Sequence, residues 1–178
     1  KIEINKVAKI ISVAILGTLL LTISAKIKIP FYPVPMTMQT FVVLLLGISF
    51  GYKLAVMTIG LYLLEGILGL PVFSNSPEKG VGLVYFTGPT MGYLIGFLFA
   101  GFLTGYLNLK TNIFFIFLKL IFSVSIIYIL GALWLGIVIG WDKPILQLGV
   151  TPFLLAEFFK ILLLTVISKK ILSVRKFI

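Results

Sequence analysis

The last apolar segment of the chain opens with the stretch Thr151-Pro152-Phe153-Leu154-Leu155-Ala156-Glu157-Phe158-Phe159-Lys160. Thr151 suits the N-cap of a helix and Pro152 suits its first position, so we expect a helix to begin here. A spacing of three residues places Glu157 and Lys160 on one face of that helix. Ionisable side chains are costly inside a membrane, and this cost favours a functional role for the pair.

The composition of the whole chain indicates that lipid surrounds this segment. Of the 178 residues, 60% are hydrophobic and only 11% are charged, whereas soluble domains carry about 25% charged residues. The long continuous apolar runs favour helices over the alternating strands of a β-barrel. We therefore expect an all-α integral membrane protein, with residues 1–178 forming one transmembrane domain in the cell (cytoplasmic) membrane.

The composition also excludes several classes of function. The sequence has no Cys and no His, which removes disulfides, thiol nucleophiles, histidine acid–base chemistry and most transition-metal sites. The net charge of +10 is scattered or lies at segment ends, so it indicates membrane topology rather than nucleic-acid binding. No G-x-x-x-x-G-K-[ST] loop occurs, so the chain does not hydrolyse ATP. We expect no cofactor and no metal.

Hydrophobicity divides the chain into six predicted transmembrane helices. These spans are residues 7–25, 36–50, 54–69, 83–107, 113–140 and 152–168. A basic lead before the first span is also typical of a signal peptide, but the span is long for one and favours an anchor. Small residues every four positions in the fourth span, from Gly88 to Ala100, predict close packing against another helix.

Basic residues predict the orientation of the six spans. An even number of spans puts both termini on one side, and nine basic residues lie outside the spans there against four on the other side: Lys1, Lys6, Lys9, Lys53, Lys110, Lys169, Lys170, Arg175 and Lys176 against Lys26, Lys28, Lys79 and Lys143. Because cytoplasmic loops carry the excess of Lys and Arg, both termini are predicted to be cytoplasmic.

With this orientation, polar side chains from five spans lie at a similar depth near the outer surface. They are Gln39, Glu65, Tyr93, Trp134, Glu157 and Lys160. The proline-rich connection 30–35 and the polar connection 71–82 lie on the same side and are candidate lids. This convergence predicts an outward-facing pocket. Its acid, base and aromatic walls suit a small, mainly neutral molecule with N–H donors.

Each of these side chains also has a structural explanation. Glu157 and Lys160 can form an ion pair that locks helices, Tyr93 and Trp134 can be interface aromatics, Gln39 can join two helices, and Glu65 can extend to the surface. In the first span, Ala8 with Ser12 and Ala14 with Thr18 are each four residues apart. Either pair can dock a partner membrane protein or pack within the chain.

Four blocks of sequence together resemble BioY, the biotin-specific S component of energy-coupling factor (ECF) transporters. The blocks are Pro33-Val34-Pro35-Met36-Thr37-Met38-Gln39-Thr40, the stretch from Tyr62 to Phe73, the stretch from Gly88 to Phe97, and the stretch from Val150 to Lys160. They occur in order over nearly the whole chain. The family pattern usually has Asp where this chain has Glu157.

The resemblance implies a six-helix membrane subunit, not an enzyme, that captures biotin from outside for ATP-driven uptake. Its implied partners are a transmembrane coupling component and two cytoplasmic ATPases. Ligand contacts are expected from Gln39, Tyr93, Trp134, Glu157 and Lys160, and lid contacts from Pro33, Val34, Pro35 and Asn75. The alternatives are an S component for another small vitamin, a membrane enzyme using Glu65 or Glu157, and a structural subunit without a ligand.

Overall fold

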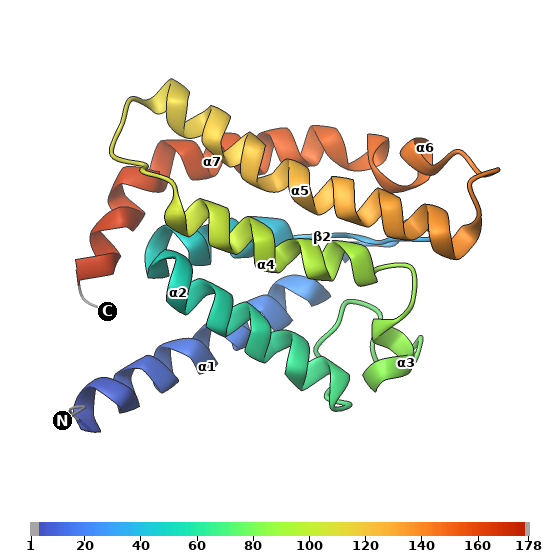
Figure 1. The fold of residues 1–178 in the computed structure, drawn as a ribbon, viewed down its shortest axis with the longest axis horizontal. Coiled ribbons are helices and arrows are strands. Elements are labelled where there is room, and N and C mark those ends of the chain that lie inside the picture. Colours follow the sequence, from blue (N-terminus) through green and yellow to red (C-terminus); the bar gives the residue numbers. More distant parts are fainter. Residues whose placement is uncertain (1–3, 177–178) are drawn as a thin grey trace.

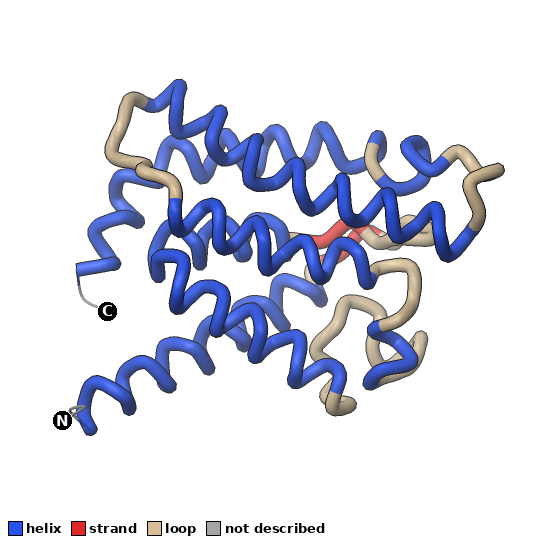
Figure 2. The backbone as a smooth tube through the Cα atoms, viewed as in Figure 1, coloured by secondary structure: helices blue, strands red, loops and turns tan. Residues whose placement is uncertain are grey.

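The computed structural model describes residues 4–176, and its regular structure is almost entirely helical (Figures 1 and 2). The elements in chain order are α1 (Ile4–Lys26), β1 (Lys28–Ile29), β2 (Met36–Thr37), α2 (Gln39–Ile67), α3 (Gly82–Phe86), α4 (Met91–Tyr106), α5 (Ile113–Ile139), α6 (Ile145–Gly149), the 3-10 helix η1 (Thr151–Phe153), α7 (Leu154–Leu172) and the 3-10 helix η2 (Ser173–Lys176). The strands β1 and β2 form a small antiparallel pair.

Helix α2 folds back on itself at Gly51, so it contains the second and third predicted spans. Gly51 has φ 74° and ψ 169°, a backbone conformation that glycine adopts without a Cβ clash. The amide of Gln39 donates to the hydroxyl of Tyr62 at 2.8 Å. In a straight helix these residues would be about 35 Å apart along the axis. The predicted break between the two spans is therefore confirmed, with a join at one residue.

Successive helical segments run back and forth along the molecule. In Figure 1, the start of α1 and the red C-terminal end of the described chain lie at one end. The β1–β2 pair, α3 and the connection before α4 lie toward the other end, where Figure 2 shows most of the loops. We call these the terminal end and the loop end. The loop end corresponds to the predicted outer side.

Four helical stretches are long and apolar enough to cross a membrane. They are Val7–Lys26, Gln39–Ile67, Ile113–Ile139 and Ile145–Lys176, and Met91–Tyr106 is a shorter apolar helix. The predicted all-α membrane architecture is thus confirmed. Division of Gln39–Ile67 at Gly51 fits the six predicted spans. The count of six and the cytoplasmic position of the termini stay predictions.

Two predicted spans differ from the structure near their first turns. The fourth span was expected to run without a break from residue 83, but α3 ends at Phe86 and α4 begins at Met91. Pro89, which lacks an amide hydrogen, lies in the break and cannot continue the helical hydrogen bonds. In the last span the 3-10 helix η1 begins at Thr151 with Pro152 in its first turn, as predicted, and α7 follows from Leu154. Only the capping role of Thr151 is wrong, because its hydroxyl donates to the carbonyl of Leu146 at 3.0 Å.

Small residues let α4 approach its neighbours closely, as the stripe in the fourth span predicts. A Cβ on Gly96 would lie 2.7 Å from the Cα of Ile127, and one on Gly92 would collide with the carbonyl oxygen of Leu130. Both contacts are with the backbone of α5. The buried apolar core lies among α2, α4, α5 and α7, and this packing fixes the rotation of the helices that carry the site.

Replacing Gly105 with alanine is expected to destabilise the protein by about 1–3 kcal/mol. The added Cβ would meet the backbone of Tyr52 just after the α2 turn, and a backbone cannot move aside as a side chain can. Gly60→Ala is the matched control, because its Cβ would lie 4.0 Å from the nearest side-chain atom, on Leu98. Denaturant unfolding in mixed micelles should separate the two variants; equal stabilities would contradict this packing account.

Candidate functional site

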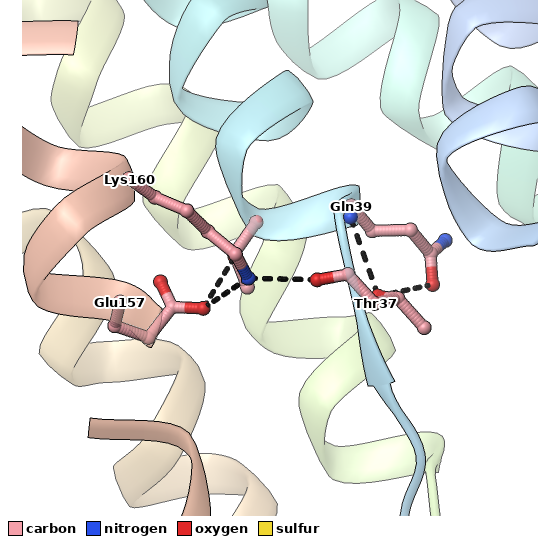
Figure 3. A network of polar contacts seen from close by, with 5 residues as sticks. Thr37, Gln39, Glu157 and Lys160 are labelled. Atoms are coloured by element: carbon pink, nitrogen blue, oxygen red, sulfur yellow. Dashed lines mark hydrogen bonds and ion pairs between the residues drawn. The ribbon is translucent and has the colours of Figure 1, made fainter. Parts of the chain in front are cut away.

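The acid–base pair at the start of α7 is buried and tightly bonded. Glu157 is 4% exposed and Lys160 is 8% exposed. The ammonium of Lys160 lies 2.6 Å from Oε1 of Glu157, so the two side chains share a helix face as the spacing predicts. Lys160 also donates to the carbonyl of Thr37 at 2.7 Å and to the hydroxyl of Thr40 at 3.0 Å (Figure 3). Its three N–H donors thus have three acceptors.

The two oxygens of the Glu157 carboxylate have different environments. Oε1 accepts from Lys160 and from the hydroxyl of Thr40, which lies 2.7 Å away. Oε2 is buried and accepts no hydrogen bond within residues 4–176, although the hydroxyl of Tyr128 lies close enough to the Glu157 carboxylate to interact with it. A buried carboxylate oxygen without a donor carries a desolvation cost that a hydrogen bond would offset. Oε2 is therefore an acceptor available to a ligand.

Glu157 and Lys160 form part of the wall of a cavity whose space between atoms is about 540 Å³, part of it open to the outside. Its polar lining comes from several parts of the chain: the β2–α2 junction, the connection between α2 and α4, and the helices α4, α5 and α7. The lining residues are Val34, Pro35, Met36, Thr37, Gln39, Thr40, Phe73, Ser74, Tyr85, Thr90, Tyr93, Leu94, Phe97, Ile127, Tyr128, Phe153, Glu157 and Lys160. The structure thus brings together four of the five predicted ligand contacts and two of the four predicted lid residues.

Gln39 and Tyr93 reach the cavity with their polar groups already bonded. The Gln39 amide donates to Tyr62, whose hydroxyl in turn donates to the carbonyl of Val72 at 3.0 Å. The Tyr93 hydroxyl donates to the carbonyl of Gly149 at 2.8 Å. These bonds hold both side chains in place, so Tyr93 offers the cavity chiefly its ring.

Trp134 is absent from the residues that line this cavity. Its indole N–H donates to the carbonyl of Gly88 at 2.9 Å, which joins α5 to the turn before α4. Its role as a ligand contact stays a prediction, whereas the hydrogen bond gives it a structural role. Glu65 is half-buried near the end of α2 and is also absent from the lining.

The predicted lid residues divide between two adjoining hollows. Val34 and Pro35 line the central cavity, while Pro33 and Asn75 line a second hollow beside it. Tyr85 and Thr90 are common to both linings, so the two hollows meet along these side chains. The four residues therefore lie over one region of the loop end, as lid residues would.

Several cavity residues were missed by sequence reasoning. Thr37 and Thr40 lie beside Gln39 in the first block, and the hydroxyl of Thr40 so close to Gln39 is the signal that could have found that residue. Tyr128 and Phe153 stack with ring centroids 6.1 Å apart, and Tyr128 meets the Tyr93 ring edge to face at 6.2 Å. This aromatic wall has no local sequence signal, because it depends on how α4, α5 and α7 are rotated.

Two lysines of the first connection hold the polar connection between α2 and α3. Lys26 donates to the carbonyls of Phe73, at 2.7 Å, and Ser76. Lys28 donates to the carbonyl of Ser74 at 2.6 Å and to the Asn75 side chain at 3.0 Å. Since Phe73 and Ser74 line the cavity, these bonds position one wall of the site. The sequence pattern of these two lysines predicts membrane orientation but not their hydrogen bonds to the polar connection.

The two small-residue pairs of α1 have different environments. Ala14 and Thr18 are buried within the chain, which is the packing alternative, so this pair does not offer a partner a free surface. Ala8 and Ser12 lie on an exposed face of α1, and the Ser12 hydroxyl donates to the carbonyl of Ala8 at 2.9 Å. Partner docking by this second pair stays a prediction.

The chain is similar to known proteins over nearly its whole length. The model of the BioY family matches residues 2–177. The probable biotin transporter BioY of Pyrococcus horikoshii is 33% identical over 164 residues, covering 92% of this chain and 96% of that protein. The biotin transporter BioY of Thermotoga maritima is 34% identical over 155 residues, covering 86% and 90%.

A solved structure agrees with these sequence matches. The crystal structure of the S-component for biotin from an ECF-type ABC transporter matches with a TM-score of 0.79 and 25% identity. The match covers 97% of this chain and 95% of that one. Because a family model, full-length relatives and a shared membrane fold agree, the chain belongs to the BioY family.

Proposed function

We propose that this chain binds biotin at the loop end and serves as the substrate-binding subunit of an ECF-type transporter. The observation that carries the proposal is the buried carboxylate of Glu157 in the wall of a cavity, whose Oε2 accepts no hydrogen bond within residues 4–176. Membership of BioY supports transport rather than turnover, so the membrane-enzyme alternative is set aside. The names of the relatives support biotin as the substrate.

Biotin has N–H donors for the carboxylate oxygen of Glu157 and an apolar part for the aromatic wall. Its ureido ring carries two N–H donors, and one of these can bond to Oε2 of Glu157. Its sulfur-containing ring is apolar and suits the aromatic wall of Tyr93, Tyr128 and Phe153, whose faces favour contact with apolar rings. Phe73 and Tyr85, which stack with centroids 5.4 Å apart, also line the cavity.

Lys160 acts first by positioning Glu157. Its three N–H groups point to Thr37, Thr40 and Glu157, so contact with a ligand oxygen requires that one of these bonds be exchanged. The carbonyl of Thr37 belongs to β2, next to the proline-rich connection. An exchange at this bond would couple ligand contact to movement of that connection, which is the lid expected to close over biotin.

The proposed setting is the cytoplasmic membrane, with the termini on the cytoplasmic side and residues 1–178 acting as one domain. The implied partners are a transmembrane coupling component and two cytoplasmic ATPases that supply the energy. The exposed Ala8 and Ser12 face of α1 is the proposed contact for the coupling component, since small residues permit close helix approach. The chain itself needs no cofactor for this role.

Competition for labelled biotin in membranes that contain the chain tests the ligand assignment. Unlabelled biotin should displace the label, whereas other small vitamins at the same concentration should not. Displacement by another vitamin with higher affinity would assign the chain to that ligand. Recovery of the bound biotin unchanged is expected, and its conversion would revive the enzyme alternative.

Replacing both Lys26 and Lys28 with methionine is expected to speed biotin dissociation by about tenfold, because partly exposed charged hydrogen bonds contribute about 1 kcal/mol or more. The substitutions remove the bonds that hold Phe73 and Ser74 against the cavity. Lys143→Met is the control, since Lys143 is exposed and pairs with the exposed Asp142. Stopped-flow displacement measures the rates; an unchanged rate in the double variant would contradict a role in holding the loop.

A further inference from the structure

The terminal end of the molecule is strongly basic. Four carboxylate side chains lie in the described part of the chain, and all belong to segments at or near the loop end: Glu65, Glu78, Asp142 and Glu157. The fifth, Glu3, lies outside the described residues. Within residues 4–176, the basic side chains at the terminal end therefore have no carboxylate side chains beside them. Their uncompensated positive charge attracts anions.

Three of these basic side chains surround one hollow between the α4–α5 connection and the end of α7. Lys110, Lys169 and Lys176 line it, and Thr111 and Ser173 add two hydroxyl groups. The empty space is about 870 Å³, part of it open to the outside. We call it the lysine hollow. No salt bridge or side-chain hydrogen bond of its three ammonium groups is formed within residues 4–176. A bound anion would relieve the repulsion among them.

An apolar groove lies along the same two helices, nearer the loop end. Its space between atoms is about 830 Å³, part of it open to the outside. It is lined by Phe117, Ile121, Val124, Ser125, Tyr128, Ile129, Val150, Leu154, Glu157, Phe158 and Ile161. Ile161 of the groove precedes Lys169 of the lysine hollow by eight residues of α7, or about 12 Å of helix. The basic hollow and the apolar groove thus lie one after the other along the contact between α5 and α7. We call this contact the seam.

We propose that this seam binds an anionic phospholipid from the leaflet at the terminal end. The lysine hollow would take the phosphate of the headgroup, and the apolar groove would take an acyl chain. Basic pockets between transmembrane helices suit such headgroups. Large apolar side chains exposed beside the hollow, such as Phe114 and Phe115, favour a lipid over an acidic protein segment, which would leave them uncovered.

The acyl chain would end beside the ligand cavity. Tyr128 and Glu157 line both the groove and the cavity, so they separate the proposed lipid from the proposed substrate. A chain in the groove would exclude water from the outer side of this wall. The lipid site itself depends only on the lysine hollow and the groove, so it stands or falls independently of biotin.

Native mass spectrometry of the full chain tests the site with three probes: phosphatidylglycerol, phosphatidylcholine of the same chain length, and inorganic phosphate. Each lysine near an anionic headgroup contributes roughly fivefold in affinity, so three should give phosphatidylglycerol an advantage of about 100-fold over phosphatidylcholine. The triple variant Lys110→Gln, Lys169→Gln, Lys176→Gln should lose most of that advantage. Inorganic phosphate should bind far more weakly than phosphatidylglycerol.

A second triple variant controls for total charge. Lys9, Lys53 and Lys170 are exposed and lie outside the hollow lining, so changing all three to Gln removes the same charge and should keep the lipid preference. Equal losses in the two triple variants would overturn the site in favour of diffuse attraction. Inorganic phosphate binding as tightly as the lipid would overturn the lipid assignment.

A groove variant tests the acyl chain separately. Ser125 is half-buried in the groove lining, and Ser125→Phe should fill the space, weakening phosphatidylglycerol binding several-fold while leaving phosphate binding unchanged. Circular dichroism and the melting temperature check that the variant is folded. Unchanged lipid binding in both this variant and the lysine variant would show that the proposal is wrong. Binding of an acidic peptide at the lysine hollow in place of the lipid would also contradict it.

Discussion

Glu157→Gln is expected to weaken biotin binding by about 10- to 100-fold while the protein stays folded. The substitution keeps the shape of the side chain but removes the negative charge, and a hydrogen bond to a charged group contributes about 1.5–3 kcal/mol. The amide also brings an N–H₂ group that can face the ligand donors. Isothermal titration calorimetry of both proteins in the same detergent measures the loss.

Glu65→Gln provides the matched control for this experiment. Glu65 also lies near the loop end of an apolar helix, but it is absent from the cavity lining. Its variant should bind biotin as the wild type does. If the two variants lose affinity equally, the loss reflects charge at the loop end, and the assignment of Oε2 as the ligand acceptor is wrong.

The second large effect is expected from Lys160→Met, which should destabilise the protein by about 3–5 kcal/mol. It leaves the Glu157 carboxylate buried without its cation and frees the carbonyl of Thr37. Biotin binding should fall as well, because Glu157 would lose its fixed position. Unfolding in detergent mixed with increasing sodium dodecyl sulfate measures the free-energy change.

The double variant Glu157→Gln, Lys160→Met distinguishes an ion pair from two independent side chains. Replacing both members of a buried pair is often nearly neutral, because no charge is left without a partner. The double variant should therefore be more stable than Lys160→Met alone, by about 2 kcal/mol or more. Additive losses would show that the two side chains do not stabilise each other.

Local sequence rules predicted the parts of the molecule that depend on local chemistry. The spacing of Glu157 and Lys160 gave their common helix face, and Gly51 lies where the second and third spans separate. The rules failed where one signal was overlooked: Gly88 and Pro89 divide the fourth predicted span, although proline inside a helical pattern predicts such a break.

The cavity wall could be predicted only in part, because depth and direction are separate properties. Depth along each span gave Gln39, Tyr93, Glu157 and Lys160, all of which line the cavity. Trp134 has a suitable depth but points its indole N–H to Gly88. Tyr128 joins the wall through the rotation of α5, which packing against α4 determines and no local pattern encodes.

Calorimetric titration of biotin into the purified, folded wild-type chain tests the central claim most directly. The account predicts tight binding of one biotin per chain, with favourable enthalpy from the charged hydrogen bond to Glu157 and a negative heat-capacity change from burial of the bicyclic ring. A folded chain that gives no heat with biotin, and no protection against thermal unfolding by it, would contradict the account.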